Sequence, residues 1–426
     1  MKNRRVVDAA AFDLSYLLRD GDTVVCGQAC AEPGTLTRKL VEHACVSSFS
    51  LSVFVGTLFS NTFDDAPANI RFLSYGAVGR ASVIADRGAL EVYPESYSQL
   101  PVLFETGQVP ADVVLLQVAV DHRGVPSFGL GCDYILEAAR RARVVVAEVN
   151  EGTPWTYGTP WPDDLRVDHW MHAELPPLVL PTAKLDAVAT AIAAHVASIV
   201  PEGATLQVGV GSLPDATLGA LSSHRHLGFH SGVLSDAGIG LIQRGAIDNS
   251  RKGSDGGISV TNTLCGSQET YRFADRNKSI EVRHSSMTHD SHHLGLLSKF
   301  HAINGALEVD LSGQVNCEEL QGRKRGGIGG LLDFSRAARA SKGGRSITVL
   351  PATAAGGKIS RIVATLDSRP VTIGRADVDT VVTEYGVAEL RNVTTAERAL
   401  RLISVAAPQH RDELAKQLRV RQRGRA

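Results

Sequence analysis

Paired cysteines, an excess of charge of one sign and long apolar runs are all missing from this 426-residue sequence. The six cysteines, at positions 26, 30, 45, 132, 265 and 317, form no C-x-x-C pair and are too few for a disulfide scaffold in a chain of this length. We therefore expect reduced thiols, most of them buried.

The charges nearly cancel, because 44 Lys and Arg side chains face 45 Asp and Glu side chains. This balance gives no support to binding of nucleic acid or of a membrane surface. The basic run RVRQRGRA at residues 419–426 is typical of a solvated terminus. No apolar run approaches the ~18 residues of a membrane span, and the first residues lack the apolar core of a signal peptide. We expect a cytoplasmic protein that acts on small molecules.

Strand-like apolar runs alternate with helical patterns through most of the sequence. DTVVC (22–26) precedes a helical pattern over 34–45, and ADVVLLQVAV (111–120) precedes another over 132–143, which VVVAEV (144–149) follows. Strands that are apolar throughout and separated by helices predict parallel sheets covered on both faces. The predicted fold class is therefore α/β.

The chain is too long for a single core, and its alternation breaks once. The segment 161–181 is rich in proline and charge, and the amphipathic run LDAVATAIAAHVASIV (185–200) restarts the pattern. We predict two domains, residues 1–184 and 185–426, each with a largely parallel sheet flanked by helices. A ligand would then bind between them, at the carboxyl ends of the strands.

Three glycine-rich turns fall in the second half. GVGSLPDA (209–216) follows a predicted strand and opens a predicted helix, where backbone N–H groups favour an anion, although it does not match the dinucleotide pattern G-x-G-x-x-G. KRGGIGGLLDF (324–334) has four glycines in five residues, and PATAAGGKISR (351–361) has a glycine pair beside a lysine. Each could be a plain turn without a ligand. Together they favour an extended, phosphorylated ligand.

Several long motifs resemble those of the acetyl-CoA hydrolase/transferase family, the CoA-transferases that act on acetate, butyrate or 4-hydroxybutyrate thioesters. In the family's order they are GQACAEPGTL (27–36), SFGLGCDYILEAA (127–139), GATLQVGVGSLPDA (203–216), EVDLSGQVN (308–316), LDFSRAA (332–338), GKISRIV (357–363) and VTEYGVAEL (382–390). The resemblance implies two CoA-transferase-type domains, a homodimer or homotetramer, and coenzyme A bound as acyl-CoA between the domains.

The same resemblance implies roles for the glycine turns. Gly329 would donate its N–H to the thioester oxygen. The residues expected to contact coenzyme A are Gly209, Val210, Gly211, Ser212, Leu213, Ala306, Gly330, Gly356, Gly357 and Lys358.

The sequence departs from the family at the nucleophile. Family members carry a motif HTE-x-x-SDG, whose glutamate attacks the acyl thioester and passes through an anhydride to a glutamyl-CoA thioester. The corresponding segment here is HSGVLSDAG (230–238), so the place of the glutamate falls on Gly232. We expect a strand that gives way to a turn at Ser231 and Gly232. His230 and Ser231 remain candidate catalytic residues beside the vacated position.

A second departure precedes the EVDLSGQVN run. Relatives carry a segment ND-P there, whose asparagine helps to polarise the thioester carbonyl, and an ungapped alignment puts His289 at that place. Histidine titrates near neutral pH and can serve as a base. We predict a catalytic His289; a packed or solvated histidine is the alternative.

Other candidates in the sequence are weaker. His284, His292, His293 and His301 surround His289, but H-x-x-H-H without a cysteine or carboxylate at standard spacing is a weak metal motif, and we expect no metal. Cys265 and Cys317 are more typical of buried thiols than of nucleophiles, and Glu308 belongs to a motif shared with active relatives. Trp155 and Tyr157 fit either an acyl pocket for a bulky group or core packing.

These features predict an enzyme of the CoA-transferase fold that acts on a thioester without a glutamyl-CoA intermediate. The acyl group would pass to an external nucleophile or to water, and a β-ketoacyl-CoA is one possible substrate. Two alternatives stay open: a conventional acyl-CoA:carboxylate CoA-transferase that uses another carboxylate, and a catalytically inactive acyl-CoA-binding subunit.

Overall fold

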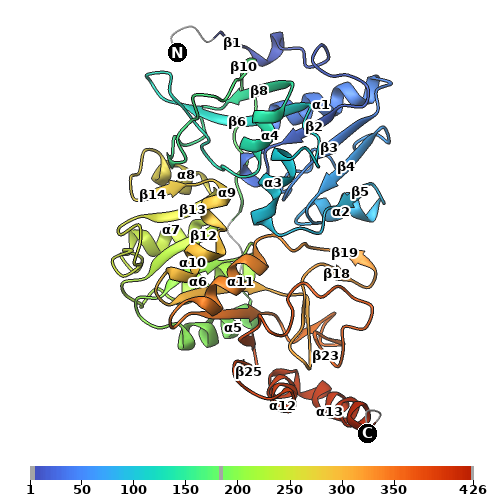
Figure 1. Ribbon diagram of the computed structural model, residues 1–426, viewed down its shortest axis with the longest axis vertical. Coiled ribbons are helices and arrows are strands. Elements are labelled where there is room, and N and C mark those ends of the chain that lie inside the picture. The colour runs from blue at the N-terminus through green and yellow to red at the C-terminus, as the bar shows by residue number, and fades with distance from the viewer. Residues whose placement is uncertain (1–4, 182–185, 424–426) are drawn as a thin grey trace.

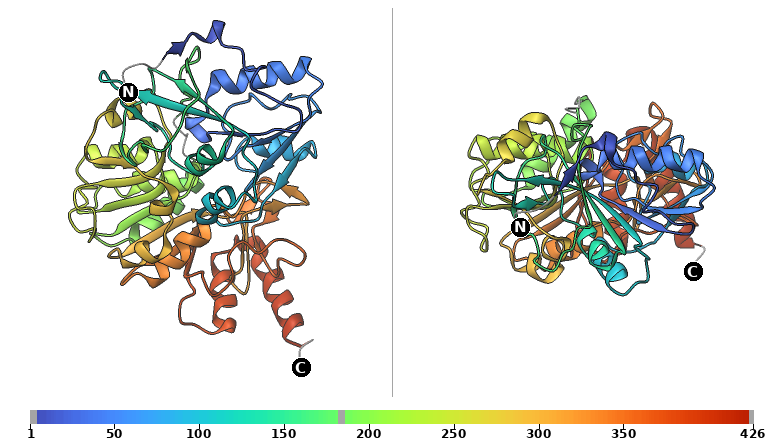
Figure 2. Two further views of the ribbon diagram at one scale, coloured as in Figure 1. Left: turned by 45° about the horizontal axis from the view of Figure 1, so that its top comes forward. Right: turned by 90° about the horizontal axis from the view of Figure 1, so that it is seen from above.

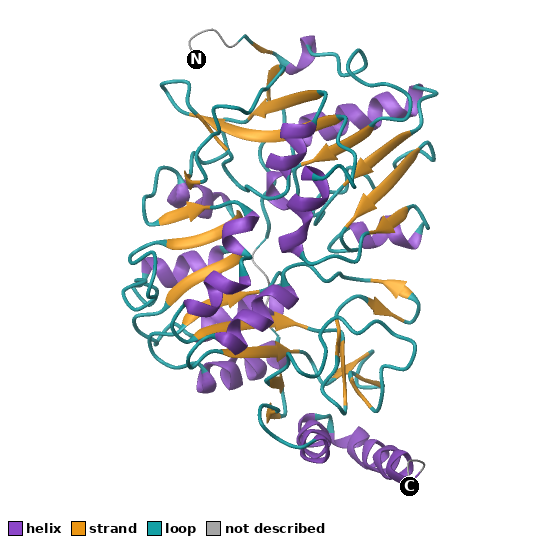
Figure 3. Cartoon of the chain, viewed as in Figure 1, coloured by secondary structure: helices purple, strands orange, loops and turns teal. Residues whose placement is uncertain are grey.

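The computed structural model describes residues 5–181 and 186–423, and it contains two large sheets with helices packed on them (Figures 1 and 3). The predicted boundary between residues 184 and 185 lies outside the described residues. In the described part of the chain no helix is long and apolar enough to cross a membrane.

The first sheet is built by the first half of the chain. Its strands lie in the order β1 (Val6–Val7), β10 (His169–His172), β8 (Val144–Val149), β6 (Val113–Val120), β2 (Thr23–Cys26), β3 (Leu51–Phe54), β4 (Ile70–Ser74) and β5 (Leu90–Val92). All these pairs are parallel, and β7 (Pro126–Ser127) pairs with β6 in the antiparallel sense. The helices are α1 (Gly34–Val46), α2 (Ala81–Asp86), α3 (Leu100–Glu105) and α4 (Ile135–Arg141).

The second sheet repeats this architecture. Its order is β25 (Gly386–Glu389), β24 (Thr380–Thr383), β20 (Arg345–Val349), β15 (Phe300–Gly305), β11 (Thr205–Val208), β12 (Gly228–Leu234), β13 (Ser259–Leu264), β14 (Ile280–Val282) and β9 (Tyr157–Gly158). The pairs are parallel except β24 with β25. The helices are α5 (Ala187–Ile199), α6 (Ser212–Ala220), α7 (Asp236–Gln243), α8 (Gln268–Ala274), α9 (Ser285–Thr288), α10 (Ser291–Leu296) and α11 (Leu331–Ala340). The predicted α/β fold with two largely parallel sheets is confirmed.

Smaller elements follow the second sheet. β16 (Glu308–Asp310), β17 (Val315–Asn316) and β23 (Ile362–Val363) form one small sheet, and β18 (Glu319–Leu320) with β19 (Arg323–Lys324) and β21 (Thr353–Ala354) with β22 (Ile359–Ser360) form two hairpins. The C-terminal helices α12 (Thr395–Val405) and α13 (Pro408–Arg423) stand at one end of the molecule (Figures 1 and 2). α12 begins in a capping box, in which Thr394 and Glu397 satisfy each other's backbone N–H groups.

One expected boundary is wrong in a way that matters for the site. The sequence predicts a turn at Ser231 and Gly232, but β12 continues to Leu234, because Val233 and Leu234 pair with Thr263 and Leu264 of β13. Gly232 therefore lies within a strand of the second sheet, and α7 begins four residues later, at Asp236.

Candidate active site

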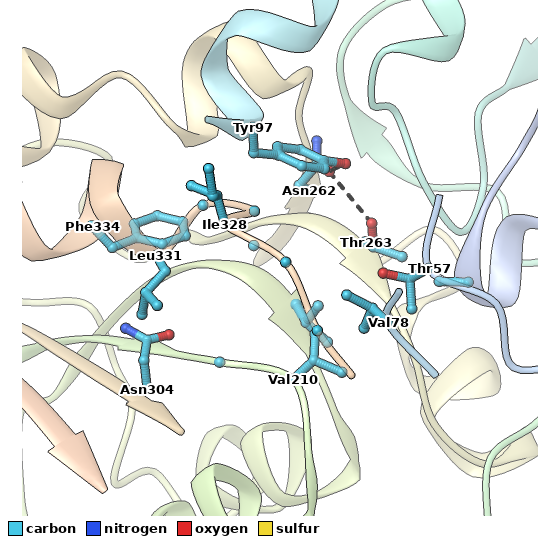
Figure 4. Close-up of a pocket in the computed structure, with 18 of the residues that line it drawn as sticks. Thr57, Val78, Tyr97, Val210, Asn262, Thr263, Asn304, Ile328, Leu331 and Phe334 are labelled. Carbon is cyan, nitrogen blue, oxygen red and sulfur yellow. Dashed lines mark hydrogen bonds between the residues drawn. The ribbon is translucent and has the colours of Figure 1, made fainter. Parts of the chain in front are cut away.

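A cavity of about 280 Å³ lies between the two halves of the chain (Figure 4). Its walls come from the carboxyl ends of β2, β11, β12, β13 and β15 and from the glycine turn that precedes α11. In Figure 4, Tyr97 from the first half and Phe334 from the second approach it from different elements. The cavity lies where the sequence predicts a ligand crevice, at the carboxyl ends of the strands, and ligand binding there stays a prediction.

Many of the residues singled out in the sequence line this cavity: Gly209, Val210, Gly232, His289, Gly329 and Gly330. Gly211 and Ser212 line a neighbouring hollow of about 420 Å³, which shares Gly209 and Val210 with the cavity. The GVGS turn therefore separates two adjoining spaces, one at the sheet ends and one beside α6.

The fold does not bring the other expected coenzyme A contacts to the cavity wall. Leu213 packs against the hydrophobic core, and the backbone N–H of Ala306 donates to the carbonyl of Val349. Gly356, Gly357 and Lys358 lie in the turn between β21 and β22, next to the C-terminal helices, where the His410 ring hydrogen-bonds the Gly357 carbonyl at 3.0 Å. A role for these residues in binding coenzyme A stays a prediction.

Ser231 has a structural position instead of a catalytic one. Its hydroxyl is fully buried, donates to the Val208 carbonyl at 3.0 Å and accepts from the Val208 N–H at 3.2 Å. These bonds tie β12 to the end of β11 and leave the oxygen no path to a substrate. His230, also fully buried, does not belong to the cavity lining either. The expectation that these two residues face the substrate is not met.

The imidazole of His289 occupies the space in front of Gly232. A Cβ added to Gly232 would lie 3.2 Å from His289 Nε2, and one added to Gly330 would lie 2.5 Å from His289 Cδ2. The ring is also flanked by Tyr97 and Phe334, with centroids at 4.4 and 4.6 Å. The two glycines therefore make room for one histidine, whose Nε2 lies beside Gly232.

The environment of His289 fixes its protonation state. Burial lowers the pKa of His289 to about 3, so the imidazole is neutral at physiological pH. The Thr288 hydroxyl lies 2.8 Å from Nδ1, whereas its other partner, the His284 carbonyl, lies at 3.4 Å. We assign the hydroxyl proton to the shorter bond, which leaves the imidazole proton on Nε2. His289 then presents an N–H to the cavity.

The first half of the chain holds the glycine turn in place. The Ala77 N–H donates to the Gly326 carbonyl at 2.7 Å, and the Tyr97 N–H donates to the Gly329 carbonyl at 2.9 Å. The side chain of Tyr97 continues the contact, because its hydroxyl donates to Asn262 Oδ1 at 2.9 Å and accepts from the Gln28 amide. A polar chain thus crosses from β2 to β13 along the cavity.

Sequence reasoning missed Gln28 and Tyr97 as site residues. Gln28 lies in the GQACAEPGTL motif directly after β2, so its position at the end of a strand was a usable signal. Tyr97 lies in a short 3-10 helix, Tyr97–Gln99, with no motif around it. Only the folded arrangement of the two halves shows its contact with His289.

A buried carboxyl group joins the two halves next to this site. Asp333 in α11 accepts hydrogen bonds from the Ser98 N–H at 3.2 Å and the Ser98 hydroxyl at 2.8 Å. Burial raises the pKa of Asp333 from its ordinary 3.8 to about 6. The folded protein therefore binds this proton more tightly than the unfolded chain does.

Because the pKa of Asp333 is higher in the folded state, this group makes the protein more stable at low pH than at high pH. Asp333 contributes stability below about pH 4 that is lost as the pH rises through about 6, amounting to roughly 3 kcal/mol. We expect Asp333→Asn to flatten the fall in the free energy of unfolding between these pH values, as measured by urea denaturation. Parallel pH curves for the two proteins would contradict this assignment.

The remaining candidate nucleophiles are unsuited to the reaction. Cys265 and Cys317 line the cavity, but the neighbouring Cys30 thiol together with burial raises the pKa of Cys265, and burial raises that of Cys317 to about 12. Glu308 is buried against Arg369, 2.5 Å away, and accepts from Asn316. Among the described residues, the cavity lining contains no Asp or Glu.

The two aromatic residues proposed for an acyl pocket lie elsewhere. Trp155 packs edge-on against Tyr157, with centroids 5.1 Å apart, and its indole N–H donates to the Val125 carbonyl. Neither residue belongs to the cavity lining. From the first half, the cavity is lined instead by neutral polar and aromatic groups, including Thr57, Tyr75 and Tyr97.

The two parallel-sheet halves with a cavity between their strand ends have a CoA-transferase-type fold, as a solved 4-hydroxybutyrate CoA-transferase from Porphyromonas gingivalis does, which superposes with a TM-score of 0.80 at 32% identity, covering 98% of both chains. The chain belongs to the acetyl-CoA hydrolase/transferase family: residues 5–165 match the model of the acetyl-CoA hydrolase/transferase N-terminal domain, and residues 266–418 match that of the C-terminal domain. It is an enzyme of this family.

Two CoA transferases and one crystal structure are similar to this chain over most of its length. The chain is 38% identical over 336 residues to a 4-hydroxybutyrate coenzyme A transferase of Clostridium kluyveri, covering 78% of each chain. It is 35% identical to a succinyl-CoA:cyclohexane-1-carboxylate CoA transferase of Geobacter metallireducens, covering 84% of this chain and 82% of the other. The crystal structure of RipA from Yersinia pestis superposes with a TM-score of 0.89 at 32% identity, covering 95% of both chains.

Proposed function

We propose that this enzyme transfers coenzyme A or an acyl group by direct attack of an external nucleophile on a bound acyl thioester, with no covalent carboxyl intermediate on the protein. The observation that carries the proposal is the space at Gly232. The His289 ring lies directly in front of Gly232, the residue that the family resemblance aligns with the glutamate, and no described residue of the cavity lining offers a carboxylate.

In this proposal His289 binds the thioester oxygen. A neutral imidazole whose pKa is about 3 is a weak base, but its Nε2–H can stabilise an oxyanion without losing its proton. It would take over the work of the asparagine that the family resemblance places here. The role as a base that the sequence suggests is therefore replaced by a role as a hydrogen-bond donor. The turn around Gly329 would supply a backbone N–H to the same oxygen.

Because His289 is a weak base, it favours an acceptor that attacks without first losing a proton. Water would need a proton acceptor to attack at a useful rate, whereas a carboxylate anion attacks without losing a proton. The carboxylate of the acceptor acid would displace coenzyme A as thiolate and form a mixed anhydride with the acyl group. The thiolate would then attack the acceptor's carbonyl in that anhydride, yielding the new thioester and releasing the first acid. Both acids would occupy the cavity with coenzyme A, and their mixed anhydride would replace the glutamyl anhydride and glutamyl-CoA thioester of the family's mechanism.

Initial-rate kinetics test this proposal. We would assay acetyl-, butyryl- and 4-hydroxybutyryl-CoA with carboxylate and amine acceptors and with water alone, following the new thioester and free thiol. The proposal predicts acceptor-dependent turnover with intersecting double-reciprocal lines, because both substrates bind before products leave.

The two alternatives give different results in the same experiment. A conventional transferase that uses another carboxylate of the chain would give parallel lines, as expected for a covalent intermediate. A catalytically inactive subunit would bind acyl-CoA without turnover of any acceptor. Either outcome would contradict the direct mechanism.

A further inference from the structure

A second cluster of polar side chains lies outside the cavity lining. His230 of β12, His293 of α10 and Asp255 of the segment between β12 and β13 each present a possible ligand atom, and these atoms all lie within 4.8 Å of one another. The two imidazole rings are tilted by 49°, with centroids 6.0 Å apart. None of the three residues lines the cavity.

The histidines of this cluster lack the partners that buried polar groups normally have. His230 is fully buried, and neither of its ring nitrogens has a hydrogen-bond partner among the described residues; the same holds for Nε2 of His293. A buried polar group left in this way costs about 1–3 kcal/mol. Burial lowers the pKa of His230, so its ring is neutral and keeps a free lone pair.

The surrounding charges leave Asp255 able to bind a cation. Its two oxygens accept from Arg283 at 2.8 and 3.0 Å, and each carboxylate oxygen keeps a further lone pair. Arg283 is also paired with Glu281, 2.7 Å away. The remaining nearby cation is Lys252, which is fully buried, donates to the Ile258 carbonyl and has its pKa lowered to about 8. The two carboxylates, Asp255 and Glu281, thus balance the two cations, Arg283 and Lys252.

We propose that His230, His293 and Asp255 bind a divalent transition-metal ion such as Zn²⁺. Two neutral imidazoles and one carboxylate form a donor set that such ions prefer, and small rotations of the side chains would close the set around one ion. This proposal departs from the sequence-based expectation of no metal: the weak H-x-x-H-H motif contains His293, but His230 and Asp255 are far from it in the chain, and only the fold assembles the three.

The position of the ion suggests what it does. His230 lies two residues before Gly232 in β12, and His293 lies four residues after His289. A metal bridging His230 and His293 would hold the segment of His289 against the strand of Gly232. The ion would therefore be structural and would not contact the thioester. This inference does not rest on the proposed reaction.

Metal titration of the full-length protein tests the site. After dialysis against a chelator, the protein would be titrated with Zn²⁺ by calorimetry and with Co²⁺ by visible absorption. We expect one ion per chain and a Co²⁺ spectrum with nitrogen ligation. His293→Ala should weaken Zn²⁺ binding by about 100-fold or more, since loss of even an outer-shell partner typically costs 10–100-fold.

The neighbouring His292→Ala is the matched control, because His292 is exposed and belongs to the same helix. It should bind Zn²⁺ like the unchanged protein. Absence of stoichiometric binding by the unchanged protein would overturn the proposal without any variant. Equal binding by the two alanine variants would overturn it as well. Circular dichroism of the metal-free proteins shows whether each variant is folded.

Discussion

Replacing Gly232 by glutamate together with His289 by asparagine is expected to turn the enzyme into one that works through a covalent intermediate. A Cβ at position 232 would lie 3.2 Å from His289 Nε2, a tight contact, so we expect the imidazole to crowd a longer side chain placed there. The next neighbour, Phe334, lies at an ordinary contact distance of 3.7 Å. With asparagine at position 289, the new carboxylate can extend toward the thioester.

The double variant should show parallel double-reciprocal lines and an acetate-dependent exchange of coenzyme A faster by on the order of 10²-fold. An attached nucleophile gains greatly over one that must be captured from solution, although imperfect placement removes part of the gain. Gly232→Glu alone is the control and should gain little, since His289 still blocks the space. Equal gains in the single and double variants would show that the histidine does not occupy the glutamate's place.

Changes at His289 alone should separate a hydrogen-bond donor from a base. His289→Ala is expected to lower kcat/KM by about 10²–10³-fold, the usual cost of one oxyanion donor. His289→Asn should retain activity to within roughly tenfold, because an asparagine amide also donates an N–H. The unchanged enzyme should show no inflection in kcat/KM near pH 6.5, since the pKa of His289 is held at about 3.

A base would behave otherwise in both measurements. His289→Asn would then be as inactive as His289→Ala, because an amide cannot accept the proton. The pH profile would rise with an inflection between about pH 5 and 8, where functional histidines titrate. Either result would restore the role that the sequence alone suggests for His289.

Much of the fold follows from local pattern in the sequence. The runs at 22–26, 111–120 and 144–149 contain the buried parallel strands Thr23–Cys26, Val113–Val120 and Val144–Val149, because a strand covered on both faces is rich in apolar residues. The end of β12 could not be predicted from local pattern, because Gly232 interrupts the run of apolar residues. The strand nevertheless continues to Leu234, because it pairs with β13. Tertiary pairing outweighs the local preference of glycine for turns there.

The site was only partly predictable for a related reason. Gly232, His289 and the turn around Gly329 have sequence motifs, so their meeting in one cavity could be expected. The partners of His289 could not be predicted, because Tyr97 comes from the other half of the chain and its contact with His289 depends on how the two sheets pack together. The depressed pKa of His289 likewise results from burial among Tyr97, Phe334 and Gly330, which no spacing in the sequence encodes.

The central claim is that no carboxylate of this chain becomes acylated during turnover. Its most direct test is to incubate the enzyme with acyl-CoA, reduce any thioester or anhydride with borohydride, and map every Asp- and Glu-containing peptide by mass spectrometry. We predict that all of these peptides keep their unmodified mass while the enzyme turns over. A reduced or coenzyme A-linked side chain at any glutamate or aspartate would contradict the account.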